Sequence, residues 1–193
     1  MNISSLAPND MAQVIRLHRL CLPNTTTSRL GFLYMQSVYE QFLAYPKHHF
    51  GFVMREQDRI VGAITITNNL SFTSAHVTPP PFSRESLAML SAIAKQQVTI
   101  RELWDRLWTE RTFLKEFPQP YATILTLFVD PEFRRRGIGE SLLKKSRAIA
   151  VEHQMLPLYV DTESSNTTAI MFYQQCGFER FKEIRNAVVL VIH

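Results

Sequence analysis

Three consecutive arginines stand directly before two closely spaced glycines, in the run Arg134, Arg135, Arg136, Gly137, Ile138 and Gly139. An apolar segment ending at Val129 precedes this run, Pro131 interrupts it, and a helical pattern follows. The first N–H groups of a helix are unpaired and attract anions, and glycine lets a ligand approach the main chain because it has no Cβ. The spacing therefore predicts a loop at residues 134–139 that binds a phosphate or pyrophosphate.

Two other phosphate-binding patterns do not fit this loop. The P-loop pattern needs a glycine and a lysine where this chain has Arg134 and Glu140. The dinucleotide pattern G-x-G-x-x-G needs a third glycine where Leu142 stands. A cluster of solvated arginines beside an ordinary glycine turn is the simpler alternative.

Two motifs in this order resemble those of the GCN5-related N-acetyltransferase superfamily. The first is R-x-x-G-x-G from Arg134 to Gly139, after a strand that ends V-x-P. The second is N-x-x-A-x-x-F-Y-x-x-x-G-F from Asn166 to Phe178. The resemblance implies an α/β (α+β) fold with a mixed, mostly antiparallel central sheet flanked by helices. It also implies that a helical insertion precedes the cofactor-binding strand.

The resemblance further implies acetyl-CoA as the acyl donor, a cosubstrate. Its pyrophosphate would lie on the amides of residues 134–139. The main chain of Leu127, Phe128 and Val129 would pair with the pantetheine arm as an added strand would. An amide near Val129 would polarise the thioester carbonyl, and one such donor is worth on the order of 3 kcal/mol. Asn166 would contact the cofactor, although its position also suits a helix N-cap.

Tyr173 matches the tyrosine that protonates the departing CoA thiolate in many members of the superfamily. A phenol with a pKa near 10 can donate a proton to a thiolate with a pKa of roughly 8.5 when the two are close. The alternative is structural. Tyr173 shares a helical stripe with Phe172 and Cys176, so its ring could simply fill the core.

The acceptor amine must lose a proton before it attacks, because its pKa is near 10. Asp161 and Glu163 follow the next predicted strand and could accept that proton directly or through water. Some members of the superfamily use a glutamate in this region, which makes Glu163 our candidate base. His48 and His49 are further candidates.

The resemblance therefore implies an enzyme, an acyltransferase of the N-acetyltransferase class. It would move an acetyl group directly to a primary amine of an unidentified small-molecule or peptide acceptor. The alternative from another class is a noncatalytic acyl-CoA-binding sensor, or a partner-binding module, with the same fold. A nucleic-acid binder that uses the arginine triplet is a third reading, but we expect no nucleic-acid partner.

Hydrophobic periodicity predicts the elements that must position these residues. A helical insertion is expected at about residues 68–120, and its Trp104, Trp108, Phe113 and Phe117 could either pack or form a wall of the acceptor site. Helices are predicted over 11–22, 28–45, 83–97, 99–117, 137–153 and 166–176. Strands are predicted over 50–54, 60–67, 121–129, 156–160, 178–184 and 187–192.

Length and composition are typical of a globular protein. Its 193 residues, 46% hydrophobic and 20% charged, predict a single globular domain over residues 1–193 that contains the insertion. The longest apolar run is far short of the roughly 20 residues that cross a bilayer, so we expect no membrane association. The start of the chain has no signal-peptide pattern, which makes the cytoplasm the expected location. A homodimer is compatible with the sequence.

Cysteine and histidine usage argues against a disulfide framework or a metal site. The only two cysteines, Cys21 and Cys176, each lie within an apolar segment. The six histidines show no metal-ligand spacing, so we expect no bound metal. The formal net charge of +4 is modest, and a small anionic ligand explains the arginine triplet better than a long nucleic acid does.

Overall fold

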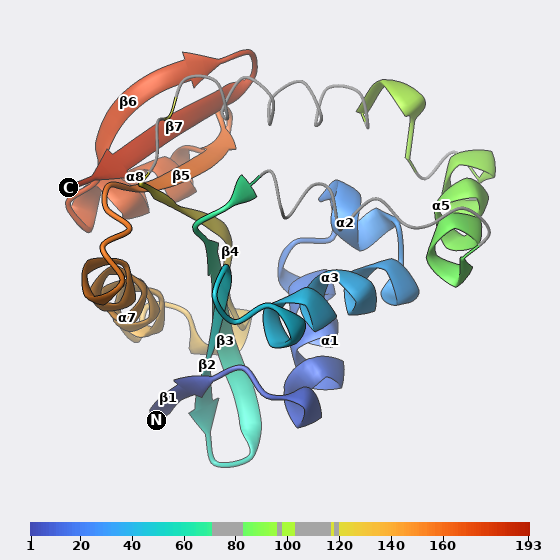
Figure 1. The fold of residues 1–193 in the computed structure, drawn as a ribbon, viewed down its shortest axis with the longest axis horizontal. Coiled ribbons are helices and arrows are strands. Elements are labelled where there is room, and N and C mark those ends of the chain that lie inside the picture. The colour runs from blue at the N-terminus through green and yellow to red at the C-terminus, as the bar shows by residue number, and fades with distance from the viewer. Residues whose placement is uncertain (71–82, 96–97, 103–116, 118–119) are drawn as a thin grey trace.

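A seven-stranded sheet forms the centre of the computed structural model, which describes residues 1–70, 83–95, 98–102, 117 and 120–193 (Figure 1). The strand order is β1-β2-β3-β4-β5-β7-β6, and β4 and β5 are the parallel neighbours in an otherwise antiparallel arrangement. This confirms the predicted mixed, mostly antiparallel sheet. The strands are β1 Asn2–Ser5, β2 His49–Glu56, β3 Arg59–Thr67, β4 Ala122–Val129, β5 Leu158–Glu163, β6 Glu179–Ile184 and β7 Ala187–Ile192.

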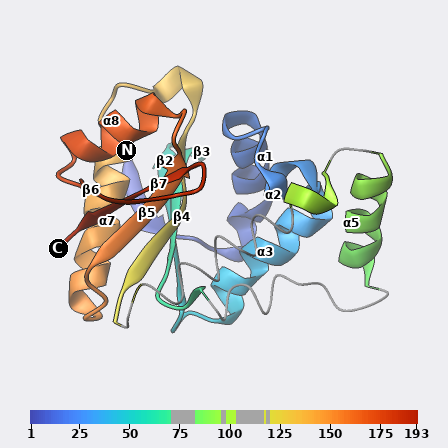
Figure 2. The same cartoon turned by 90° about the horizontal axis from the view of Figure 1, so that it is seen from above.

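Helices cover both faces of the sheet. Figure 2 shows α1 and α3 on one face and α7 and α8 on the other, and each pair closes its own hydrophobic cluster against the strands. Among the described residues, none of the helices is long and apolar enough to cross a membrane. The helices are α1 Met11–Cys21, α2 Thr26–Arg29, α3 Phe32–Ala44, α5 Arg84–Ala94, α7 Ile138–Glu152 and α8 Thr167–Gln175, with 3-10 turns at Pro8–Asp10 and Pro131–Phe133.

Three elements differ from the sequence prediction. The single helix predicted over 28–45 is wrong, because the chain forms α2 and α3 with a break at Gly31, whose φ of +93° does not continue a helix. Strand β1 was not predicted, since its four residues carry a single large apolar side chain, Ile3. Strand β5 begins two residues later than predicted and extends to Glu163.

The described part of the predicted insertion packs against α3. Helix α5 confirms the first predicted helix of this region, and Ser83 caps it by accepting a hydrogen bond from the Ser86 amide at 3.1 Å. A buried cluster joins the two helices, and it consists of Leu30, Tyr34, Ala92 and Val98.

The second predicted helix, 99–117, lies mostly outside the described residues, as do Trp104, Trp108 and Phe113.

A β-bulge interrupts the pairing of β4 with β3. Thr126 lies opposite Thr65 and Ile124 lies opposite Ile66, so Leu125 between them has no counterpart. The bulge changes the alternation of side chains along β4. Ile124 packs in the cluster with α7, whereas Leu125 packs in the cluster with α1 and α3.

A chain of polar side chains, all buried except the partly buried Thr126, connects α1 and α3 to this bulge. The Nδ1 atom of His18 lies 2.7 Å from the Tyr39 hydroxyl, and the Thr65 and Thr126 hydroxyls lie 2.7 Å apart. Burial raises the pKa of Tyr39, and a hydrogen bond from Thr126 opposes that rise, which links the two pairs. The Nε2 atom of His18 is buried and has no hydrogen-bond partner among the described residues.

We expect acid pH to destabilise the fold through His18. Burial lowers the pKa of His18 from 6.5 to about 4, so between these values the unfolded chain binds a proton that the folded chain excludes. The free energy of unfolding should therefore fall as the pH drops from about 6.5 to about 4, by up to about 3 kcal/mol from this residue. Above this range both states hold a neutral ring, and the contribution should vanish. Urea unfolding at a series of pH values measures the slope.

The matched control is His153→Gln, at an exposed residue, which should keep the wild-type slope. His18→Gln should lose the part of the slope that His18 supplies. An identical slope in both variants would show that His18 does not cause the acid sensitivity.

Candidate functional site

Strands β4 and β5 separate after three paired residues, and we call the place where they separate the fork. Ala122, Thr123 and Ile124 pair with residues 158–160 of β5, while β4 continues to pair with β3 as far as Val129. The stretch from Leu125 to Val129 therefore has a strand neighbour on one side only, among the described residues. An open strand edge presents main-chain N–H and C=O groups that an extended ligand can bind.

The loop after β4 is held by its own side chains. Asp130 caps the 3-10 turn by accepting a hydrogen bond from the Glu132 amide at 3.0 Å, and it also accepts one from Arg59 at 2.7 Å. Arg134 donates to the Val129 carbonyl at 3.2 Å. Arg136 donates to the Glu132 carbonyl at 3.2 Å. Two arginines of the triplet therefore shape the loop in this structure, and their contact with a phosphate stays a prediction.

The amides of the loop and of the first turn of α7 form the predicted anion site. Within the part of the chain that the structure describes, the N–H groups from Arg135 to Glu140 donate to no protein acceptor. Arg135 and Gly137 adopt left-handed conformations, with φ of 61° and 75°. A Cβ on Gly137 would meet no protein atom within 4 Å, so the space beside it is open to a ligand. The residues present therefore fit a bound pyrophosphate.

Gly139 also has a packing role, and its contact with the cofactor stays a prediction. A Cβ at this position would lie 3.2 Å from the ring of Phe172, so the missing side chain makes room for α8 rather than for a ligand. Gly62 does the same beneath α7, where a Cβ would lie 2.9 Å from Ile138. The two sequence motifs thus touch through Gly139 and Phe172.

Asn166 caps α8. Its Oδ1 accepts a hydrogen bond from the Ala169 amide at 3.1 Å, and its Nδ2 donates to the Thr162 hydroxyl at 3.3 Å. Both ends of the side chain are therefore engaged within the protein. Its predicted contact with the cofactor remains a prediction.

Tyr173 is buried in the cluster under α8, with 6% of its surface exposed. Among the described residues, its hydroxyl has no hydrogen-bond partner, whereas its ring contacts Phe172 and Phe178 at centroid distances of 5.3 and 5.5 Å. Burial raises the pKa of Tyr173, and the nearby charges of Asp161 and Cys176 raise it further. The phenol therefore keeps its proton at neutral pH, as a general acid must.

The two candidate carboxylates are both exposed, and they differ in the groups near them. Asp161 is the first residue of β5 beyond its pairing with β4, and its charge is one that acts on Tyr173. Glu163 lies two residues farther along β5, is exposed, and accepts a hydrogen bond from Ser165 at 3.5 Å. Asp161 is therefore the carboxylate with an electrostatic link to the candidate acid, which the sequence could not distinguish.

His48 and His49 lie apart from this fork. His49 begins β2, which is separated from β4 by β3, so the two strands are about 10 Å apart. His48 contacts the Asn68 side chain at 3.1 Å. Among the described residues, no group of three or more His, Cys, Asp or Glu side chains could hold a metal ion.

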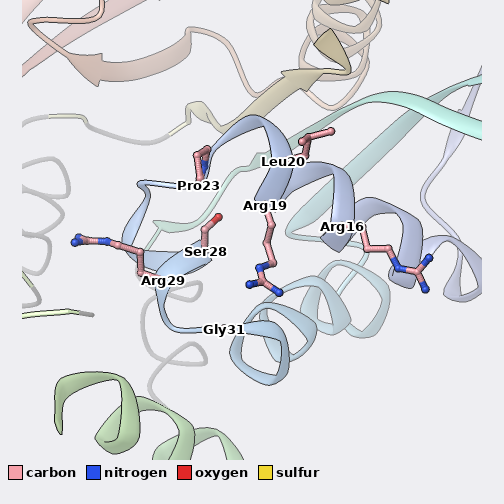
Figure 3. Close-up of a pocket in the computed structure, with 7 residues that line it drawn as sticks. All are labelled: Arg16, Arg19, Leu20, Pro23, Ser28, Arg29 and Gly31. Carbon is pink, nitrogen blue, oxygen red and sulfur yellow. The ribbon is translucent and has the colours of Figure 1, made fainter. Parts of the chain in front are cut away.

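A separate cavity of about 560 Å³ lies beside α1 and α2 (Figure 3). Arg19 points between α1 and α3, whereas Arg16 and Arg29 point away in opposite directions. Arg29 forms an ion pair with Glu102 at 2.8 Å. The arginines do not converge on one ligand position, so we assign the cavity no function. It is lined by Arg16, Arg19, Leu20, Pro23, Ser28, Arg29 and Gly31.

Comparison with known proteins gives three findings. The model of the Acetyltransferase (GNAT) family matches residues 12–178. N-alpha-acetyltransferase 30 of Xenopus laevis is 36% identical over 70 residues, which cover 36% of this chain and 25% of that protein. The ribosomal protein bS18-alanine N-acetyltransferase of Salmonella typhimurium is 34% identical over 65 residues, which cover 34% of this chain and 44% of that protein. The chain thus matches less than half the length of these curated relatives.

A solved structure extends the likeness over the whole fold. The PaiA N-acetyltransferase from Thermoplasma acidophilum, in complex with coenzyme A, superposes with a TM-score of 0.62. The match covers 99% of this chain and 98% of that one at 12% sequence identity. At this identity the likeness concerns the fold.

Proposed function

The chain belongs to the acetyltransferase (GNAT) family, and on that premise we propose that it is an acetyl-CoA-dependent N-acetyltransferase that transfers the acetyl group directly to a primary amine. The contact between Gly139 and Phe172 carries the proposal. It ties the amide-lined loop to α8, so that the anion site and the next residue, Tyr173, form one packed unit. The use of acetyl-CoA favours a cytoplasmic location.

The residues of the loop and of β4 would hold the donor. The amides from Arg135 to Glu140 would bind the pyrophosphate, and the open edge of β4, with Leu127, Phe128 and Val129, would pair with the pantetheine arm. Bound acetyl-CoA would supply the activated thioester. An amide near Val129 would donate a hydrogen bond to the thioester oxygen and stabilise the charge that develops there.

Two side chains would move the protons. The amine nitrogen forms the new bond to the acetyl carbon as the carbon–sulfur bond breaks, so the sulfur gains a proton and the nitrogen loses one. Tyr173 would give its proton to the sulfur, because burial and nearby negative charge keep it protonated until then. Asp161 would accept the proton from the amine, directly or through water, in preference to Glu163.

Blocking the loop should abolish binding of coenzyme A. In Gly137→Trp, an indole would fill the open space beside the free amides, and we expect affinity for coenzyme A to fall by at least about 100-fold, measured by calorimetry. Gly31→Trp is the matched control, since Gly31 also has a positive φ and no protein atom near its Cβ. That control also places an indole at a positive φ, where Gly31 has φ 93° and ψ 179°, and it should keep the affinity. Wild-type affinity in Gly137→Trp would contradict the proposed site.

Removing the proposed acid should slow turnover without weakening the binding of coenzyme A. We expect Tyr173→Phe to lower kcat by about 100-fold or more, because the thiolate would leave without its proton. The dissociation constant for acetyl-CoA should stay within about twofold, since no bond to the phosphates is lost. Tyr34→Phe, at a buried tyrosine that packs against α5, should change neither quantity. Unchanged turnover in Tyr173→Phe would return this tyrosine to a purely structural role.

The two carboxylates can be separated by one pair of variants. We expect Asp161→Asn to lower kcat/KM for the amine by about 10- to 100-fold at neutral pH, because the ammonium form would lose its proton acceptor. The deficit should shrink at alkaline pH, where more of the amine is already neutral. Glu163→Gln should stay within about twofold of the wild type. The reverse pattern, with Glu163→Gln impaired, would assign the base to Glu163.

The noncatalytic alternative has a distinct outcome. A sensor would bind acetyl-CoA but release no coenzyme A in the presence of any amine. Release of coenzyme A with a panel of small amines and peptides therefore separates an enzyme from a sensor. A homodimer and the absence of a nucleic-acid partner remain predictions.

A further inference from the structure

The open half of β4 lacks the support that a central strand normally receives. It begins with the bulge at Leu125, and from Thr126 to Val129 it pairs with β3 but not with β5. A strand with one neighbour can twist and shift more freely than a strand with two. Something else must hold this segment if its main chain is to stay in one position.

Side chains of α1 and α3 contact three residues of this segment, Thr126, Phe128 and Val129. The His18 ring lies against the Phe128 ring, with centroids 5.1 Å apart. The Cys21 thiol donates to the Val129 carbonyl at 3.3 Å. Thr126 donates a hydrogen bond to the Tyr39 hydroxyl, and the Thr126 hydroxyl lies 2.7 Å from that of Thr65 on β3.

We propose that His18, Tyr39, Thr126 and Thr65 form a polar clamp that holds the open half of β4 in the position required for acyl transfer. These are positioning residues, and the inference rests on the proposed function. Thr126 follows the bulged residue, and Phe128 follows two positions later on the same face. The clamp therefore holds the segment on both sides of Leu127, whose main chain lies on the open edge.

A simple gain in stability does not explain the clamp. His18, Tyr39 and Thr65 are buried and Thr126 is partly buried, and the Nε2 atom of His18 has no partner among the described residues. Burying polar groups is costly, and a buried group left unsatisfied costs more, so an apolar core of the same shape would hold α1 and α3 on the sheet at least as well. Directed hydrogen bonds do what apolar packing does poorly, because they select one rotamer and one register.

The first test needs neither coenzyme A nor activity. Amide hydrogen exchange should be measured in the wild type, Thr126→Val and Tyr39→Phe. We expect the amides of 125–129 that bond to β3 to exchange about 10-fold faster in both variants, while those of 122–124 are unchanged. Thr123→Val is the matched control, because Thr123 is a buried threonine of the same strand whose hydroxyl has no partner among the described residues. Its exchange at 125–129 should match the wild type.

The second test separates positioning from folding. We expect Thr126→Val and Tyr39→Phe each to lower kcat by about 10-fold, with the dissociation constant for acetyl-CoA within about twofold. The double variant should be no worse than the poorer single variant, because both act through one chain of hydrogen bonds. Thr126→Ser keeps the hydroxyl and should restore at least half of kcat. Thr123→Val should turn over like the wild type.

Each outcome bears on one claim. Unchanged exchange at 125–129 in both variants would overturn the clamp. Faster exchange with unchanged kcat would show that the clamp serves the fold alone and would overturn its role in acyl transfer. If the wild type binds coenzyme A yet acetylates no amine, the proposed function fails, and the exchange data alone then support or overturn the clamp.

Discussion

The parting of β4 and β5 is the constraint on which the rest of the structure depends. Pairing between them ends at Ile124 and Val160, and beyond that point β4 has no strand partner on this side among the described residues, although it lies in the middle of the sheet. The main-chain groups at this opening need hydrogen bonds from water or from a ligand. The fork therefore creates an extended binding edge at the centre of the protein, where both faces of the sheet are already covered by helices (Figure 2).

Two close contacts between glycines and side chains bring the chemical groups to this edge. Gly62 lets Ile138 at the start of α7 lie directly on β3, and Gly139 lets Phe172 of α8 lie on the first turn of α7. The free amides of the loop and the hydroxyl of Tyr173 are thereby fixed relative to one another by packing. Close-packed interiors tolerate little displacement, so this geometry is set before any ligand binds.

Burial controls the protonation of the groups around the fork. It keeps Tyr173 protonated on the side of α8, and it keeps His18 neutral on the side of α1. The same physical effect suits two different tasks, because a phenol must retain a proton to act as an acid and a neutral imidazole can join a chain of hydrogen bonds. Burying these two polar side chains costs stability, which an apolar core would have avoided, so their presence serves function rather than stability.

The sequence by itself determined the loop and the elements around it. Glycine conformations, a helix N-cap at Asn166 and hydrophobic periodicity are local properties, so the glycine-containing loop, α7 and α8 could be predicted without a structure. Pairing between distant strands is not local. The fork at Ile124, the bulge at Leu125 and the charge of Asp161 beside Tyr173 emerged only from the tertiary structure, because register and proximity depend on how the whole sheet assembles.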